Sequence, residues 1–226
     1  MGSFLIIIFV VLISYIVGSF PSAFIISKIF FGFDIREKGS GNMGSTNAFR
    51  VLGWKWGIIV QVLDIAKGLI AVLFIANIFG EPYNFGSDYF ENTTIMKIIA
   101  GISAVLGHIF SMFVSFKGGK GINTAFGMLI GIAPIEVGIA LGLFAIAVII
   151  SGYISLGSIV GAFSVPISLI FRHNVFGVDI PGYLTLTYFL SALAIILILA
   201  HLPNIKRLIN GTENKFHKLH LIKLKK

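Results

Sequence analysis

The chain contains several long apolar stretches, and the first runs from residue 4 to residue 26 without a charged side chain. At 1.5 Å per helical residue, about 20 apolar residues cross the roughly 30 Å hydrocarbon core of a bilayer. The composition agrees, because 57% of the residues are hydrophobic and only 12% are charged. Soluble domains are about 45–50% apolar and about 25% charged. We therefore expect an all-α, polytopic integral membrane protein and exclude a water-soluble globule.

The apolar stretches predict about seven transmembrane helices. Pro21 is expected to kink the end of the first one. Residues 122–134 are apolar but short, so the stretch 122–171 could instead form one span with re-entrant pieces, giving five spans. Both counts are odd and place the two termini on opposite sides of the membrane. The expected spans are 4–26, 56–79, 95–116, 122–134, 137–152, 154–171 and 183–201.

Basic residues are distributed very unevenly over the segments between these spans. One side receives five in the loop 27–55, two in the turn 117–121 and seven in the tail 206–226, whereas the other side receives Arg172 alone. The side that is rich in Lys and Arg is the cytoplasmic one. We therefore expect the N-terminus outside, the C-terminus in the cytoplasm, and a basic tail lying on anionic headgroups.

The charge and the cysteine content narrow the possible functions. The net charge of +8 is compatible with nucleic acid, anionic lipid or an anionic substrate. No folded basic face or aromatic platform accompanies the basic tail, so we do not expect nucleic acid binding. The chain has no cysteine, which excludes disulfides, thiolate nucleophiles and Cys-ligated metals.

A dense group of small and polar residues, KGSGNMGSTNAFR at 38–50, follows the first span. Its glycines allow the backbone to approach a ligand closely, and its hydroxyl, amide and guanidinium groups can bind phosphate oxygens. An ordinary turn followed by a helix cap is the alternative, although a cap needs only one such residue. The candidate substrate-binding residues are Lys38, Ser40, Asn42, Gly44, Thr46, Asn47 and Arg50.

A second polar segment, GHIFSMFVSFKGGKGINT at 107–124, contains a glycine-rich turn with lysines at its edges. Such a turn suits a phosphate at the positive end of a following helix. It is not a Walker A loop, because position 114 is Val and no Ser or Thr follows Lys120. The alternative is a plain cytoplasmic turn that obeys the positive-inside rule. The candidates here are Lys120 as a catalytic residue, and His108, Lys117, Gly118, Gly119 and Gly121 as binding residues.

A third polar segment, AHLPNIKRLINGTE at 200–213, follows the last span. His201, Asn204 and Arg207 recur every three residues and would share one face of a helix, with Pro203 in its first turn. An interfacial histidine without a chemical role is the alternative. Asp64 and Lys67, three apart inside the second span, are expected to form an ion pair that supports the site from below.

Taken together, these three segments resemble the three motifs of the bacterial acyl-phosphate:glycerol-3-phosphate acyltransferases (the PlsY family), in order and approximate spacing. The segment from Asp64 to Gly68 also resembles that family's second helix. Departures are small, with Ser45 where Ala is usual and Thr124 in a variant end of the second motif. The resemblance implies one membrane acyltransferase domain over 1–226, in the bacterial inner (cytoplasmic) membrane, with its active site on the cytoplasmic face.

The resemblance also implies a reaction. A fatty acyl group would pass from acyl-phosphate to the 1-hydroxyl of sn-glycerol 3-phosphate, giving lysophosphatidic acid and inorganic phosphate as the first step of phospholipid synthesis. Acyl-phosphate has a good leaving group and acids are scarce near the three segments, so no metal or other cofactor is expected. The soluble enzyme that makes acyl-phosphate is a candidate partner.

Residue roles follow as hypotheses. Lys120 and the 118–121 turn would hold the donor phosphate, and the 38–50 segment would bind glycerol 3-phosphate, with charge lent by Lys38 and Lys117. His201 and Asn204 would orient the attacking hydroxyl, beside Arg207 as a further substrate-binding residue. The general base is either His201 or a substrate phosphate, with His108 a weaker candidate. Glu213 would be a structural support.

A transporter of phosphorylated anions is the alternative from another functional class. Transporters often have internal repeats and polar motifs that open to both faces. The sequence has no visible repeat, and the segments expected outside carry few polar motifs.

Overall fold

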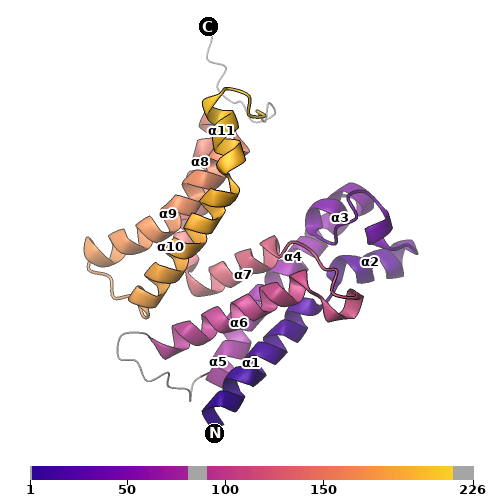
Figure 1. The fold of residues 1–226 in the computed structure, drawn as a ribbon, viewed down its shortest axis with the longest axis horizontal. Helices are drawn as coiled ribbons and strands as arrows, with labels where there is room; N and C mark the ends of the chain where they lie inside the picture. Colours follow the sequence, from indigo (N-terminus) through magenta and orange to yellow (C-terminus); the bar gives the residue numbers. More distant parts are fainter. Residues whose placement is uncertain (1, 81–90, 216–226) are drawn as a thin grey trace. The chain divides into compact units, whose positions relative to one another are not determined.

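The computed structural model describes residues 2–80 and 91–215, and every regular element in these two ranges is a helix (Figure 1). The predicted all-α fold is therefore confirmed. Contacts divide the chain into two compact units, Met1–Ile132 and Ala133–Lys226, which are described separately below. The single domain expected over 1–226 stays a prediction. Glu81, Asp88 and the last part of the basic tail, 216–226, lie outside the described residues.

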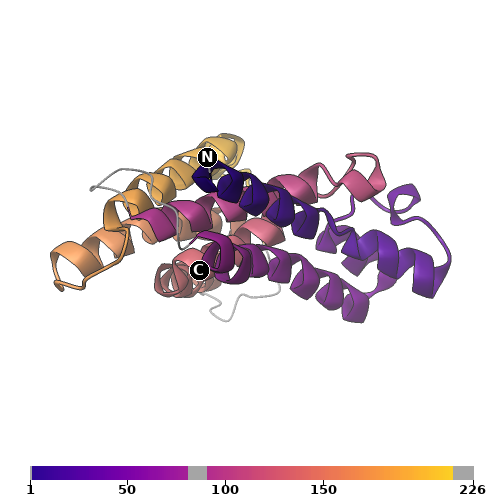
Figure 2. The ribbon, with the colours of Figure 1, turned by 90° about the horizontal axis from the view of Figure 1, so that it is seen from below.

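The first unit is built from two closely packed helix pairs. α1 packs against α6 and α4 packs against α7, and Figures 1 and 2 show α1 and α6 side by side. A π-helical segment, Ala71–Ile75, joins α4 to α5, and short 3₁₀ turns lie at Ile35–Glu37 and Met112–Val114. The helices are α1 (Gly2–Ser19), α2 (Ser22–Phe31), α3 (Ser45–Leu52), α4 (Trp54–Ile70), α5 (Ala76–Gly80), α6 (Asn92–Ile109) and α7 (Ile122–Ile132).

Pro21 interrupts the first apolar stretch, where the sequence led us to expect only a kink. α1 ends at Ser19 and α2 begins at Ser22. Proline cannot donate a backbone hydrogen bond, and its ring clashes with the preceding turn. The apolar stretch Phe4–Phe31 is therefore divided into two helices, and the second is followed by Gly32, whose positive φ of 74° suits glycine.

The second unit contains α8 (Pro134–Ser151), α9 (Ile154–Asn174), α10 (Tyr183–Ala200) and α11 (Leu202–Ile209). α9 packs against both α8 and α10. The buried Glu136 near the start of α8 forms an ion pair with Arg172 near the end of α9. Arg172, the one basic residue expected on the outer side, is therefore neutralised by a neighbouring acid.

Six helical stretches of the described chain are long and apolar enough to cross a membrane. Two of them, α8 and most of α9, fall in the stretch 122–171, where the five-span alternative allowed one. α7 has 11 residues, which at 1.5 Å per residue is about 16 Å, roughly half of the hydrocarbon core. The count of seven spans and the orientation of the termini therefore stay predictions.

Glycines allow the helices of the first unit to touch backbone to backbone. A Cβ on Gly68 would lie 2.1 Å from the Thr124 carbonyl oxygen, and one on Gly127 would lie 2.0 Å from that of Ile65. Small residues of this kind let the backbones of membrane helices approach closely. Close packing matters in lipid, because no hydrophobic effect drives the helices together. This contact fixes the position of α7 and of the polar turn that precedes it.

We expect Gly127→Ala to lower the thermal stability of the protein. Its Cβ would collide with the Ile65 carbonyl, and overpacking of this kind costs about 1–3 kcal/mol. Thermal unfolding of the purified protein in detergent measures the effect. Gly142→Ala in α8 is the matched control, because a Cβ there meets no atom within 4 Å. An equal loss of stability in both variants would contradict the account of the α4–α7 contact.

Candidate active site

The first polar segment forms a tight loop that is held by Asn47 from α3. The Asn47 Oδ1 accepts from the Ser40 N–H at 2.9 Å, and its Nδ2 donates to the carbonyl of Lys38 at 3.1 Å. Gly39 and Gly41 both have positive φ, as the curl of this loop requires. Because Asn47 is 1% exposed and its amide is occupied by the backbone, it positions the loop more than it offers groups to a ligand.

The start of α3 opens toward the same loop. Gly44 precedes the helix, and its N–H donates to Asn42 Oδ1 at 2.8 Å. No side chain caps the first turn of α3. The amino end of a helix presents free N–H groups and a partial positive charge. Ser45 and Thr46 are the first residues of α3, so this end of the helix favours an anion.

The second polar segment folds back on the end of α6. The Gly118 N–H donates to the Ile109 carbonyl at 2.9 Å, and the Gly119 N–H donates to the His108 carbonyl at 3.0 Å. A Cβ on Gly118 would lie 1.9 Å from the His108 carbonyl oxygen, and one on Gly119 would lie 2.2 Å from the His108 Nε2. These two glycines therefore permit close packing and their amides are occupied. The anion nest expected over 118–121 is reduced to Lys120 and Gly121.

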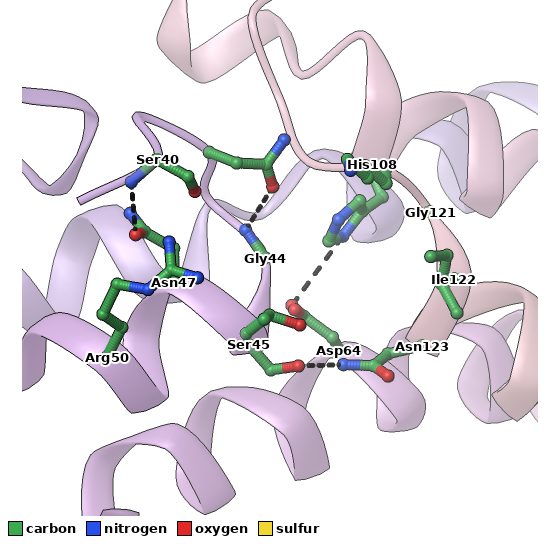
Figure 3. A pocket seen from close by; sticks show the side chains of 13 residues that line it. Ser40, Gly44, Ser45, Asn47, Arg50, Asp64, His108, Gly121, Ile122 and Asn123 are labelled. Carbon is green, nitrogen blue, oxygen red and sulfur yellow. Dashed lines mark hydrogen bonds and ion pairs between the residues drawn. The ribbon is translucent and has the colours of Figure 1, made fainter. Parts of the chain in front are cut away.

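The two segments meet around a cavity of about 280 Å³ (Figure 3). This volume lies just below the roughly 300–1,000 Å³ of pockets for drug-sized ligands, so it suits a small molecule. Asn123 and Ser45 join its two sides, since the Asn123 Nδ2 donates to the Ser45 Oγ at 2.9 Å. The lining residues are Ser40, Asn42, Gly44, Ser45, Thr46, Asn47, Arg50, Asp64, His108, Lys120, Gly121, Ile122 and Asn123.

Cationic side chains lie at the exposed side of this cavity, and a carboxylate lies at its buried side. The cationic side chains of Arg50 and Lys120 belong to exposed residues, whereas Asp64 and His108 are buried, at 1% and 7% exposed. Guanidinium and ammonium groups beside a helix amino end favour an anion at the exposed side. The buried side offers a carboxylate and an imidazole.

At the buried side of the cavity lies the ion pair that the sequence predicted. The Lys67 Nζ is 2.6 Å from the Asp64 Oδ1, and the Ser22 Oγ donates to the same oxygen at 2.5 Å. The Lys67 Nζ also contacts the Ser22 Oγ at 3.0 Å. The Asp64–Lys67 pair is therefore confirmed, and it ties α4 to the beginning of α2.

The third polar segment lies in the second unit and forms α11, with Pro203 in its first turn as predicted. The Asn204 Nδ2 and the Arg207 Nε donate to the two carboxylate oxygens of Glu213, at 2.9 Å and 2.6 Å. These two contacts lower the pKa of Glu213 below its ordinary value. Glu213 therefore remains an anion that fixes both side chains.

His201 immediately precedes α11 and holds a defined tautomer. Its Nδ1 lies 2.8 Å from the Leu197 carbonyl oxygen, which can only accept, so Nδ1 carries the proton in this contact. In the neutral ring, Nε2 then has the free lone pair. The side chain is half-buried, so this nitrogen can serve as a base toward a hydroxyl brought to it.

The structure brings together only part of the predicted site. Lys38, Lys117, Gly118 and Gly119 do not line the cavity, while His201, Asn204, Arg207 and Glu213 belong to the second unit. The sequence analysis did not select Ser45 and Asn123, and it placed Asp64 below the site although this residue lines the cavity. The signal for Asn123 was its polar amide two residues after Gly121, at the start of an apolar helix.

Comparisons with known proteins identify the family of this chain. The chain matches the sequence profile of the family described as "Glycerol-3-phosphate acyltransferase" over residues 8–211. A glycerol-3-phosphate acyltransferase of Chlorobaculum tepidum is 43% identical over 220 residues, covering 91% of this chain and 94% of the relative. One of Chlorobaculum parvum is 42% identical over the same length, with the same two coverages.

Two solved structures of PlsY (YgiH), an integral membrane glycerol 3-phosphate acyltransferase, are also similar. The glycerol 3-phosphate form has a TM-score of 0.64 and 30% identity, covering 93% of this chain and 95% of that one. The lysophosphatidic acid form has a TM-score of 0.66 and 27% identity, covering 94% and 97%. The family profile spans parts of both units, the first two polar segments and residues 200–211 of the third. The chain therefore belongs to the glycerol-3-phosphate acyltransferase family.

Proposed function

We propose that this protein transfers a fatty acyl group from acyl-phosphate to the 1-hydroxyl of sn-glycerol 3-phosphate, releasing lysophosphatidic acid and inorganic phosphate. The observation that carries the proposal is the cavity in the first unit, where the 38–50 segment and the 118–121 turn meet. Membership of the family and the two ligand forms of the similar solved structures support it.

The cavity is the binding site for glycerol 3-phosphate in this proposal. Arg50 and Lys120 bind the phosphate from the exposed side, and the amino end of α3 adds its free N–H groups. Ser40 and Thr46 supply hydroxyl donors, while Asn47 keeps the loop in place. Lys120 lines the acceptor cavity and also stabilises the charge on the departing donor phosphate, as the second motif suggested.

Acyl-phosphate is a mixed anhydride and needs no acyl-enzyme. The acceptor oxygen attacks the acyl carbonyl carbon, the bond from that carbon to the phosphate oxygen breaks, and the hydroxyl proton passes to a base. Orientation of the reactants supplies most of the acceleration, because positioned groups reach very high effective molarities. Two phosphate groups repel each other, which explains the cations at the site.

His201 is the proposed general base, acting through its Nε2, with Asn204 orienting the hydroxyl and Glu213 holding Asn204. A phosphate of the substrate itself is the alternative base. His201 and Asn204 belong to the second unit, so their assignment rests on their chemistry and on the third motif of the family resemblance.

We also propose that the protein lies in the cytoplasmic membrane with the cavity on its cytoplasmic face. Basic residues of the first unit gather in the loops that form the cavity and beside them, which agrees with the positive-inside rule. In this position a soluble enzyme that makes acyl-phosphate could deliver the donor directly.

The test of the function is an assay of purified protein in lipid with sn-glycerol 3-phosphate and one acyl donor at a time. We expect acyl-phosphate alone, without added metal, to give lysophosphatidic acid and inorganic phosphate in equal amounts. Product from acyl-CoA or acyl carrier protein instead would contradict the proposed donor. A folded protein that binds glycerol 3-phosphate but forms no product from any donor would favour an anion transporter.

Lys120→Ala is expected to lower kcat/KM for glycerol 3-phosphate by about 10- to 100-fold, because a hydrogen bond to a charged group is lost. Steady-state rates at varied acceptor concentration measure it. Lys55→Ala is the matched control, since Lys55 is also an exposed lysine of the first unit but does not line the cavity. Equal rates for wild type and Lys120→Ala would overturn the phosphate assignment.

His201→Gln keeps a polar side chain but removes its basicity, so kcat is expected to fall by about 10²- to 10⁴-fold if His201 takes the proton. The control is His173→Gln, a histidine in α9 that stacks on Tyr183 with ring centroids 3.8 Å apart. Near-normal turnover of His201→Gln would remove this histidine as the base and leave the substrate phosphate.

A further inference from the structure

One oxygen of the buried Asp64 carboxylate is unused. The Asp64 Oδ2 is inaccessible to solvent and has no hydrogen-bond partner among the described residues. A buried acceptor without a partner costs free energy, and native structures contain few of them. This one belongs to a residue that lines the cavity, so a ligand is the natural source of its partner.

The surrounding donors do not reach this oxygen. Lys67 and Ser22 both contact the other oxygen, Oδ1, and the His108 Nδ1 also lies near Oδ1, at 3.7 Å. Across the cavity, the Asn123 amide donates to Ser45 instead (Figure 3). No described side chain therefore supplies a partner for Oδ2, and a donor bound in the cavity that Asp64 lines can supply one.

We propose that Asp64 Oδ2 accepts a hydrogen bond from the 2-hydroxyl of bound glycerol 3-phosphate, so that Asp64 determines the specificity of the acceptor site. This inference rests on the proposed function. A phosphate dianion has no proton to donate and is repelled by a carboxylate, whereas a hydroxyl donates. The 1-hydroxyl is the attacking group of the proposed reaction, which leaves the 2-hydroxyl for Asp64.

The distribution of charge gives the substrate one orientation. The cations Arg50 and Lys120 are exposed and the carboxylate is buried, so the phosphate lies outward and the polyol inward. Lys67 makes this possible by neutralising Asp64 through the other carboxylate oxygen, because its Nζ donates to Oδ1 at 2.6 Å. Without that lysine, a buried charge would be left without compensation.

The test compares sn-glycerol 3-phosphate with propane-1,3-diol monophosphate, which keeps the attacking hydroxyl and lacks only the 2-hydroxyl. In wild type we expect kcat/KM to fall by about 10- to 100-fold for the analogue, because a hydrogen bond to a charged acceptor is lost. In the double variant Asp64→Leu, Lys67→Met the two substrates should differ by less than about threefold, because no acceptor remains. Replacing both members avoids burying a lone charge.

The matched control is Asp34→Leu, Arg36→Met, which removes an ion pair of 2.7 Å between residues that do not line the cavity. It should keep the wild-type discrimination between the two substrates. If the apolar double variant does not fold, Asp64→Asn provides the same comparison with a smaller loss of discrimination, because a neutral acceptor binds a hydroxyl more weakly.

Two results would overturn the inference. One is equal use of both substrates by wild type, and the other is wild-type discrimination that persists in the Asp64 variants. Displacement of radiolabelled glycerol 3-phosphate by the analogue gives the same comparison without turnover. Failure of the proposed reaction is therefore distinguishable from failure of the Asp64 assignment.

Discussion

The buried pair of Asp64 and Lys67 is the interaction on which the site depends. Two charges inside a membrane segment are tolerated only when they neutralise each other and are hydrogen-bonded, and here Ser22 completes the set. The pair joins α4 to the start of α2 at the buried side of the cavity. It therefore fixes the buried end of the site and leaves Asp64 Oδ2 without a partner among the described residues.

Backbone contacts decide what can be placed above this pair. Glycines 68 and 127 bring α4 and α7 together, and glycines 118 and 119 hold the following turn against the end of α6. As a result, Lys120 reaches the same cavity as Arg50, although they are far apart in sequence. These glycines act mainly by their lack of a side chain, which permits close packing. Phosphate binding is therefore assigned to the side chains of Arg50 and Lys120 and to the amino end of α3.

The sequence predicted the features that depend on composition and local spacing. Apolar stretches indicated the helices, the spacing of Asp64 and Lys67 predicted their ion pair, and the position of Pro203 predicted the first turn of α11. The sequence could not predict the tertiary hydrogen bonds, because residue types do not reveal which polar groups already bind other parts of the protein. Asn47 and the amides of Gly118 and Gly119 were expected to meet a ligand, and they bind the protein's own backbone.

The central claim is that the cavity holds glycerol 3-phosphate with its phosphate outward. An experimental structure of the protein in lipid with this substrate tests the claim most directly. The account predicts the phosphate between Arg50 and Lys120 and a glycerol hydroxyl within hydrogen-bond distance of Asp64 Oδ2. A phosphate bound away from these two cations, or a glycerol moiety turned toward solvent, would contradict it.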